Sequence, residues 1–331
     1  MAKKIAINGF GRIGRLTFRS LLDNEEVEVV AINDLTDNAT LAHLLKYDTA
    51  HGILDRDIKA DQDNIYIDGR KIVALAERDP SKLPWKDLEV DFVLECTGIF
   101  RSREKAGMHL QAGAKKVLIS APAQGDVKTI VLGVNDEEID PNETIFSNAS
   151  CTTNCLAPVI KLLDENFGIE VGSMSTIHAY TADQNLQDAP HKDLRRARAA
   201  AQNIVPTSTG AAKAVREVYP SIGDKIMAMS YRVPTLTGSI IDLAVKVKKS
   251  TTAEEVNNIF KNAAEGDLKG ILKYETDPIV SSDVVRSPYS SIFDAELTTC
   301  DNDFIRVVSW YDNEAGYSAR LGELAVRLAT M

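Results

Sequence analysis

The spacing of apolar residues in the first half of the chain predicts alternating strands and helices. Residues 5–7 and 27–32 are short apolar runs typical of buried strands, and residues 13–22 between them repeat apolar positions at helical spacing. The same pattern predicts a hairpin at 66–73, strands at 90–96 and 117–119, and a helix at 102–112. This order is typical of a parallel sheet packed against helices, so we predict an α/β, doubly wound domain.

From about residue 150 the pattern changes. Leu156, Val159, Ile160 and Leu163 mark one face of a helix that we expect to end at Gly168. Longer strands and one further helix follow, with strands at 172–181, 226–233, 240–247 and 304–311 and the helix at 253–264. These elements predict an α+β domain with a mostly antiparallel sheet that is covered on one side.

Two other segments of the second half have their own patterns. Residues 182–206 are polar with weak periodicity, which predicts a long ordered loop, and loops of this length are usually functional or disordered. Residues 317–328 form an amphipathic pattern that predicts a helix able to pack back on either domain.

Composition narrows the class of protein. The 331 residues are 44% hydrophobic and carry a net charge of −10, which argues against nucleic acid as the main partner. Four cysteines are too few for a disulfide framework and indicate a reducing, cytoplasmic compartment. No uncharged run approaches the roughly 20 residues of a membrane span, so we expect no membrane partner and no signal peptide.

A glycine motif follows the first predicted strand. Residues 9–14 read G-x-G-x-x-G, a helix pattern follows, and Asp34 ends the second strand twenty positions after Gly14. Glycines let the backbone approach a pyrophosphate, and the helix N-terminus binds that anion. The motif alone would equally fit a tight turn before a helix, but this context indicates dinucleotide binding. The Asp34 carboxylate suits a ribose hydroxyl and would repel a 2′-phosphate, which favours NAD over NADP.

Cys151 is the candidate nucleophile. It lies on the first turn of the predicted helix at 151–167, with Ser150 as a plausible N-cap. Free amides and the helix dipole favour a thiolate there, and such thiols have pKa values of roughly 3.5–7.5. Cys155 lies one turn further on and is best interpreted as a small buried hydrophobe, since the His and Cys needed for a metal site are missing around it. His178 by itself would be interpreted as a core histidine.

Together these segments resemble phosphorylating glyceraldehyde-3-phosphate dehydrogenase of the bacterial, NAD-dependent type. The resemblance runs from residue 4 to about 328, and its motifs lie at 5–14, 147–155, 178–181, 194–198, 206–210 and 310–314. It implies a Rossmann-type NAD-binding domain at 1–149, a catalytic domain at 150–313, and a C-terminal helix at about 314–331 that packs back on the first. It also implies a homotetramer in which residues 182–206 lie near the cofactor and a neighbouring subunit.

The resemblance implies a role for each matching residue. Cys151 attacks the aldehyde of D-glyceraldehyde 3-phosphate, and His178 is the base that also keeps the thiolate as an ion pair. Hydride passes to NAD, and inorganic phosphate releases 1,3-bisphosphoglycerate from the acyl-thioester. The implied NAD ligands are Gly9, Gly11, Arg12, Ile13, Asp34, Arg78, Ser120 and Asn313. The implied phosphate ligands are Thr181 and Arg232 at one site, and Ser150, Thr152, Thr209, Gly210 and Arg196 at the other.

Some positions depart from the family pattern and leave alternatives open. Ala315 stands where a tryptophan is usual beside Asn313, and Ala189 stands where NAD-specific members often have leucine, so some NADP use is compatible with the chain. Leu236 and Gln124 also differ from the usual residues. Erythrose-4-phosphate dehydrogenase is the nearest alternative activity, and a non-catalytic NAD-binding interaction protein is the alternative of another class.

Overall fold

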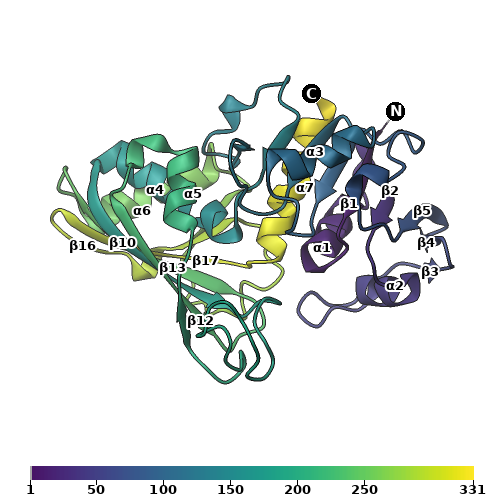
Figure 1. The fold of residues 1–331 in the computed structure, drawn as a ribbon. Helices are drawn as coiled ribbons and strands as arrows, with labels where there is room; N and C mark the ends of the chain where they lie inside the picture. The colour runs from purple at the N-terminus through teal and green to yellow at the C-terminus, as the bar shows by residue number, and fades with distance from the viewer. Residues whose placement is uncertain (1) are drawn as a thin grey trace. The chain divides into compact units, whose positions relative to one another are not determined.

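The computed structural model describes residues 2–331, which divide into two compact units. Unit 1 contains the chain up to Ile130 together with Glu137–Ala149 and Ser318–Met331, and unit 2 contains Val131–Asp136 and Ser150–Tyr317. The short segment Val131–Asp136 belongs to unit 2, where Lys161 Nζ donates to the Val134 carbonyl at 2.9 Å. Figure 1 shows the elements of each unit along the colour gradient.

Unit 1 is built on a nine-stranded sheet in the order β3-β4-β5-β2-β1-β6-β7-β9-β8. Its strands are β1 (Lys3–Asn8), β2 (Val27–Asn33), β3 (Ile58–Ala60), β4 (Asn64–Ile67), β5 (Arg70–Leu75), β6 (Phe92–Glu95), β7 (Lys116–Ile119), β8 (Lys128–Thr129) and β9 (Ile145–Ser147). All pairs from β5 to β8 are parallel, whereas β3, β4 and β5 pair antiparallel. The chain winds outward from β1 in both directions, which is the doubly wound order with a switch point beside β1.

Helices connect these strands. They are α1 (Arg12–Leu21), α2 (Asn38–Lys46) and α3 (Arg103–Gln111), with short 3-10 turns η1 (Pro80–Lys82) and η2 (Asp136–Glu138). From Ser318 onward, α7 (Ala315–Thr330) also belongs to unit 1, and its apolar face is buried. A Cβ on Gly322 would lie 2.8 Å from Ser20 Oγ, so α7 lies directly against the end of α1.

The glycine loop explains why β1 and α1 can meet so closely. Gly9 has φ +91°, and a Cβ on Gly14 would lie 2.2 Å from the Gly9 carbonyl oxygen. No other residue fits at Gly14, because the helix backbone rests on the strand end. The predicted hairpin is also present, turned at Asp68 and Gly69 with φ values of 51° and 80°.

Unit 2 is built on an eight-stranded sheet in the order β11-β12-β10-β13-β17-β15-β14, with β16 paired to β17. Its strands are β10 (Ile169–Ala179), β11 (Val205–Thr207), β12 (Ile226–Val233), β13 (Ser239–Val247), β14 (Leu272–Glu275), β15 (Ser291–Asp294), β16 (Thr299–Asp301) and β17 (Phe304–Tyr311). Only the pairs β10–β12 and β14–β15 are parallel, so the sheet is mostly antiparallel, as the sequence predicts.

Helices cover this second sheet. They are α4 (Cys151–Phe167), α5 (Ala211–Val218) and α6 (Ala253–Glu265), with 3-10 turns η3 (Pro220–Ile222) and η4 (Ala295–Leu297). Figure 1 shows the three helices gathered on one side of β10, β13 and β17. The predicted apolar face of α4 is buried, from Leu156 to Leu163. Between β10 and β11 the chain forms the long loop expected from the sequence, without helix or strand.

No helix within residues 2–331 is long and apolar enough to cross a membrane.

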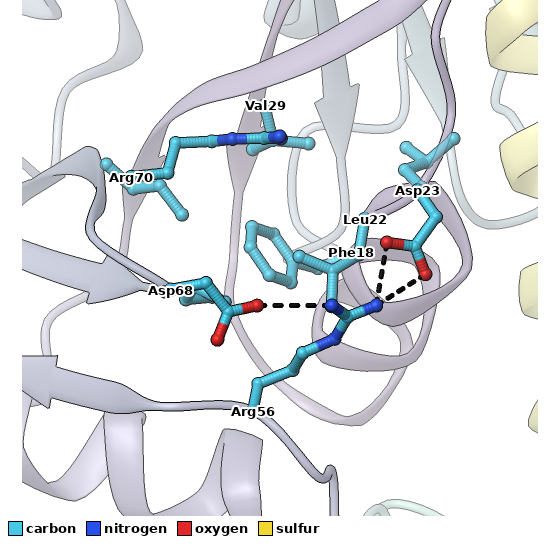
Figure 2. Close-up of a pocket in the computed structure, with 10 residues that line it drawn as sticks. Phe18, Leu22, Asp23, Val29, Arg56, Asp68 and Arg70 are labelled. Atoms are coloured by element: carbon cyan, nitrogen blue, oxygen red, sulfur yellow. Dashed lines mark hydrogen bonds and ion pairs between the residues drawn. The ribbon is translucent and has the colours of Figure 1, made fainter.

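A cavity of about 110 Å³ lies in unit 1 at the C-terminal end of α1, over buried Phe18 and Val29. Figure 2 shows the Arg56 guanidinium at its rim between the carboxylates of Asp23 and Asp68. Arg56 pairs with both carboxylates, and the cavity lies at the opposite end of α1 from the glycine loop.

Candidate active site

The centre of the site is a half-buried thiol beside a buried imidazole in unit 2. Cys151 Sγ lies 3.4 Å from His178 Nε2. Cys151 begins α4, where Ser150 is the N-cap and its Oγ accepts from the Thr153 amide at 3.1 Å. His178 lies near the end of β10. The structure therefore brings together two residues 27 positions apart, at the start of a helix and the end of a strand.

Hydrogen bonds determine which imidazole nitrogen faces the sulfur. His178 Nδ1 lies 2.6 Å from the Ala179 carbonyl oxygen, which can only accept, so Nδ1 carries the proton. Nε2 is then an unprotonated acceptor directed at Cys151. The Ala179 amide in turn donates to Ser239 Oγ at 3.1 Å, which fixes the end of the strand. This arrangement is that of a base ready to take the thiol proton.

The electrostatics of the pair differ from the expectation based on the helix start alone. Burial raises the pKa of the Cys151 thiol, although the Arg232 charge and the amides of the first turn oppose the rise. Burial, and then the Arg232 charge, lower the pKa of His178 to about 3. Burial thus opposes charge on both groups and acts against the helix dipole. The ion pair between Cys151 and His178 that the resemblance implies stays a prediction.

A tyrosine that the sequence did not single out packs against the imidazole of this pair. Tyr311 is buried at the end of β17, and its hydroxyl lies 3.0 Å from Thr152 Oγ1 and 2.9 Å from Thr176 Oγ1. Its ring packs edge-on to His178, with centroids 6.0 Å apart. Thr152 was expected to bind phosphate, yet its hydroxyl is buried on Tyr311, which leaves its backbone amide as the group available to an anion.

Arg232 lies beside His178 because of strand register. β10 and β12 pair in parallel with His178 opposite Arg232. The guanidinium Nη1 lies 3.3 Å from His178 Nδ1, donates to the Thr181 hydroxyl at 2.9 Å, and contacts the Ala179 carbonyl at 3.3 Å. Burial lowers the pKa of Arg232 and the Asp183 charge opposes this. A half-buried guanidinium with a hydroxyl neighbour is a suitable phosphate site.

Asp183 links the two predicted phosphate sites, and sequence reasoning missed it. Its carboxylate accepts from the Thr181 hydroxyl and, at 2.7 Å, from Arg196 Nη1. Burial alone would raise the pKa of Asp183, but Thr181, Arg232 and Arg196 outweigh it and hold that pKa below its usual value. The only signal in the sequence is its position two residues after Thr181, at the start of the long loop.

The remaining predicted phosphate ligands lie around Arg196 and α5. Arg196 Nε donates to Thr207 Oγ1 at 3.0 Å, and its neighbour Arg198 pairs with Asp188 on the surface. Thr209 Oγ1 accepts from the Ala211 amide at 3.2 Å. Gly210 precedes α5 and provides no side-chain cap, so the amides that follow Ala211 in the first turn can donate to an anion.

The predicted cofactor ligands of unit 1 lie at the carboxyl ends of its parallel strands. Gly11 is the N-cap of α1 and brings no side chain, which leaves the amides at Arg12 and Ile13 exposed to an anion. Asp34 follows β2, and its carboxylate accepts from the Phe10 amide at 2.8 Å and the Thr36 amide at 3.0 Å. A carboxylate has further lone pairs, so it can still accept from ribose hydroxyls.

The other predicted cofactor ligands are placed as follows. Arg78 is exposed after β5, and Ser120 follows β7, its amide bonded to the Glu95 carbonyl at 2.9 Å. The Arg12 guanidinium pairs with Asp48. The donors available at the glycine loop, together with Asp34, fit a dinucleotide.

Asn313 belongs to unit 2 and is fixed in one orientation. Its Oδ1 accepts from Ser239 Oγ at 2.9 Å and from the Gly238 amide at 3.2 Å, while the Thr237 hydroxyl donates to the neighbouring Asp312 at 2.8 Å. Two donors on the oxygen leave the amide nitrogen of Asn313 as the group that can donate. The carboxylate of the neighbouring Asp312 accepts from the amides of Glu314 and Ala315 and so caps the start of α7. Ala315 takes part in this cap through its backbone amide.

The other thiols do not compete with Cys151. Burial raises the pKa of Cys96 and of Cys155 to about 12 in each case. Cys155 is fully buried in α4 with its sulfur 3.6 Å from Ser291 Oγ, which agrees with a packing role. Across residues 2–331, no cluster of three His, Cys, Asp or Glu side chains could hold a metal ion.

A doubly wound nucleotide-binding unit, joined in one chain to a thiol–imidazole pair beside two guanidiniums, defines a dinucleotide-dependent oxidoreductase that works through a cysteine. Comparison with known families identifies which one. The glyceraldehyde 3-phosphate dehydrogenase, NAD binding domain, matches residues 3–103, and the C-terminal domain of the same family matches residues 150–313. The chain belongs to the glyceraldehyde-3-phosphate dehydrogenase family.

Curated relatives match over almost the whole chain. The glyceraldehyde-3-phosphate dehydrogenase of Geobacillus stearothermophilus is 55% identical over 332 residues, covering 100% of this chain and 99% of the relative. That of Mycobacterium tuberculosis (strain ATCC 25618 / H37Rv) is 59% identical over 331 residues, covering 98% of both. Glyceraldehyde-3-phosphate dehydrogenase 1 of Bacillus cereus is 54% identical over 329 residues, covering 99% and 98%. The predicted family, fold class and cofactor are confirmed.

Proposed function

We propose that this protein oxidises and phosphorylates D-glyceraldehyde 3-phosphate to 1,3-bisphosphoglycerate, with NAD and inorganic phosphate, in glycolysis. The observation that carries the proposal is the 3.4 Å contact between Cys151 Sγ and His178 Nε2, with the Arg232 guanidinium 3.3 Å from the same ring. This arrangement supplies a nucleophile, a base and an anion-binding group together. Full-length similarity to named dehydrogenases of this substrate supports the choice.

The two phosphate groups would be held by two sets of residues. Thr181 and Arg232 would bind the phosphate of the substrate, and Arg196, with the loop before α5, would bind inorganic phosphate. The second set comprises Ser150, Thr152, Thr209, Gly210 and Arg196. Asp183 accepts from Arg196 and from Thr181, so we propose that it holds both sets in place until anions arrive.

The proposed chemistry starts from His178 with its ring proton on Nδ1 and with Nε2 free to accept the thiol proton. His178 Nε2 takes the proton of Cys151 as the sulfur attacks the aldehyde carbon, so that a C–S bond forms and the carbonyl oxygen becomes negative. Protonated His178 and the Cys151 backbone amide stabilise this oxygen, and His178 returns its proton to it. His178 then removes the hydroxyl proton while the carbon loses a hydride, which leaves a thioester on Cys151. Phosphate attacks the thioester, and the sulfur leaves as thiolate and is reprotonated.

NAD accepts the hydride when it is bound. Unit 1 would hold it through Gly9, Gly11, Arg12, Ile13, Asp34, Arg78 and Ser120, and unit 2 would contribute Asn313. We accordingly propose that residues 1–149 with the C-terminal helix are the NAD-binding domain and that 150–313 are the catalytic domain. The fixed Asn313 amide suits the carboxamide of the nicotinamide, because its nitrogen is the group left to donate.

We further propose a homotetramer in the cytoplasm. Large apolar side chains of unit 2 are exposed on the long loop and on β12, including Leu186 at 82%, Leu194 at 80% and Met227 at 65%. Exposed apolar side chains at this density indicate contact with another protein surface. All four cysteines are free thiols, which suits a reducing compartment.

The test is a coupled assay with purified protein. We expect NADH to form from D-glyceraldehyde 3-phosphate and NAD at a rate that rises strongly when inorganic phosphate is added. Erythrose 4-phosphate is the competing substrate, and a higher kcat/KM for it would replace the proposed substrate. If neither aldehyde reduces NAD, the protein is not the proposed enzyme.

A further inference from the structure

A chain of buried polar side chains crosses the carboxyl edge of the sheet in unit 1. At its centre is Glu95, the last residue of β6, which is buried. Its Oε2 accepts from Asn8 Nδ2 at 2.6 Å and lies 3.0 Å from His109 Nε2. Its Oε1 accepts from the Thr97 amide at 2.8 Å and from the Thr97 hydroxyl. We call the connected side chains of Trp85, His109, Glu95, Asn8 and Asn33 the edge network.

The edge network spans four neighbouring strands. From Glu95 at the end of β6 it passes to Asn8 at the end of β1, and Asn8 Oδ1 accepts from Asn33 Nδ2 of β2 at 2.7 Å. Asn33 then bonds the backbone of Glu77, just beyond β5, through both of its amide atoms at 2.8 and 2.9 Å. The sheet order is β5-β2-β1-β6, so each bond joins one strand end to the next.

The direction of every hydrogen bond in the network is determined at its two ends. The Glu77 amide can only donate and its carbonyl can only accept, which orients Asn33 and therefore forces Asn8 Nδ2 to donate to Glu95. At the other end, Trp85 Nε1 can only donate, and it lies 3.0 Å from His109 Nδ1. His109 must therefore carry its proton on Nε2 and donate it to Glu95. Glu95 Oε2 therefore accepts from both sides, and Oε1 accepts from the Thr97 amide, as a carboxylate can.

Three of the four strand ends in the network lead directly into a predicted cofactor loop. Asn8 precedes the glycine loop, Asn33 precedes Asp34, and Glu77 precedes Arg78. Gly9 is packed against the Cys96–Thr97 peptide, where an added Cβ would lie 2.7 Å from the Thr97 amide nitrogen. A shift of any one of these strand ends would therefore displace the loop that follows it.

We propose that Glu95 is a positioning residue for NAD: its buried carboxylate holds the three cofactor loops that follow β1, β2 and β5 in register without touching the cofactor. The proposal rests on NAD binding by unit 1. Among residues 2–331, no lysine or arginine pairs with this carboxylate, so neutral donors alone satisfy it. Pre-formed loops reduce the ordering cost of binding, so the network contributes to cofactor affinity rather than to the chemical step.

Glu95→Gln tests the proposal because it keeps the size of the side chain and replaces one acceptor oxygen with a donor nitrogen. If its oxygen continues to accept from Thr97, its amide nitrogen faces two donors, Asn8 Nδ2 and His109 Nε2. One such buried donor–donor contact should raise the Kd for NAD about tenfold. We expect the KM for NAD to rise in parallel, while kcat at saturating NAD and the KM for glyceraldehyde 3-phosphate stay near their wild-type values. Isothermal titration and steady-state kinetics give the two readouts.

A second substitution tests the direction of the bonds. Trp85→Phe removes the donor that holds His109 in its tautomer, so His109 Nε2 becomes able to accept from the new glutamine. The Trp85→Phe/Glu95→Gln protein should therefore bind NAD more tightly than Glu95→Gln alone. If the network only fills space, the losses of NAD affinity caused by Trp85→Phe and by Glu95→Gln multiply in the double variant, and that result would overturn the proposal.

The matched control is Asp91→Asn. Asp91 directly precedes β6, at the opposite end of that strand from Glu95, and its carboxylate accepts from the Lys4 amide at 3.0 Å and pairs with Lys115. This variant should bind NAD as the wild type does, and an equal loss there would show a general effect of destabilising the sheet. If the wild-type protein does not bind NAD, the proposed function fails. If it binds and Glu95→Gln binds equally well, only the positioning role fails. Should Glu95→Gln not fold, His109→Phe replaces it under the same criterion.

Discussion

Replacing Arg232 by glutamine separates recognition of the substrate phosphate from the chemistry at Cys151. The guanidinium is on a strand next to His178 and already donates to Thr181 at 2.9 Å, so a phosphate beside Thr181 would receive at least one charged hydrogen bond from it. Glutamine keeps a polar side chain of similar reach and removes the charge. The variant should therefore lose affinity for the anion while the thiol and the imidazole stay in place.

The expected loss in kcat/KM comes from phosphate binding, because the effects of Arg232 on the pKa values of Cys151 and His178 offset each other in the proton transfer. The Arg232 charge lowers the pKa of Cys151 and also lowers the pKa of His178, so its removal raises both and leaves the transfer between them little changed. What is lost is one or two charged hydrogen bonds to phosphate, together about 3 kcal/mol. That loss corresponds to about a hundredfold in kcat/KM, at 1.4 kcal/mol for each tenfold.

Two substrates distinguish the effects. With glyceraldehyde 3-phosphate, Arg232→Gln should lower kcat/KM about a hundredfold, whereas with unphosphorylated glyceraldehyde it should change kcat/KM by less than about fivefold. Arg306→Gln is the control, because Arg306 is an exposed side chain on β17 of the same sheet in a pair with Asp242, and it should behave as wild type. Equal losses with the two aldehydes would refute the assignment of Arg232 to the phosphate.

Three further outcomes are expected. Cys151→Ser should abolish NADH formation while NAD still binds in a titration, and measurable turnover by this variant would rule out the covalent mechanism. Asp34→Gly should improve kcat/KM with NADP, which the wild type should use poorly, and equal wild-type rates with NAD and NADP would contradict the role of Asp34. Arg103 and backbone amides hold the pKa of Glu143 at about 2, below its value in the unfolded chain. The Arg103–Glu143 pair therefore stabilises the fold at any pH above the unfolded pKa. This contribution is lost as the pH falls toward 2. Glu143→Gln should therefore lower the free energy of unfolding at neutral pH by about 2 kcal/mol and flatten its dependence on pH in acid, as urea melts at several pH values would report.

Much of unit 1 could be predicted because its signals are local. The glycine loop works through backbone geometry at Gly9 and Gly14, and the strand before it and the helix after it are each defined by their own apolar spacing. The start of α4 was equally local, since the N-cap at Ser150 and the cysteine after it are adjacent in the chain. Such features depend on neighbouring residues, which a sequence contains in full.

The roles within the active site depended on resemblance, because their residues meet only through the sheet. Cys151 and His178 are 27 positions apart, and Arg232 reaches His178 through the parallel register of β10 and β12. Asp183 was missed for the same reason: its partner Arg196 is 13 positions away across an irregular loop. Periodicity cannot specify such pairings.

By itself, the sequence determined the class of fold, the glycine loop with Asp34, and a cysteine at a helix start. Only the tertiary structure showed that burial raises the pKa of that cysteine and so acts against the helix dipole that the sequence predicts. It also decided that Glu95, an unremarkable acidic residue in the sequence, accepts hydrogen bonds from residues as distant as Asn8 and His109. Local backbone preferences are contained in neighbouring residues, whereas desolvation and long-range hydrogen bonds exist only once the chain has folded.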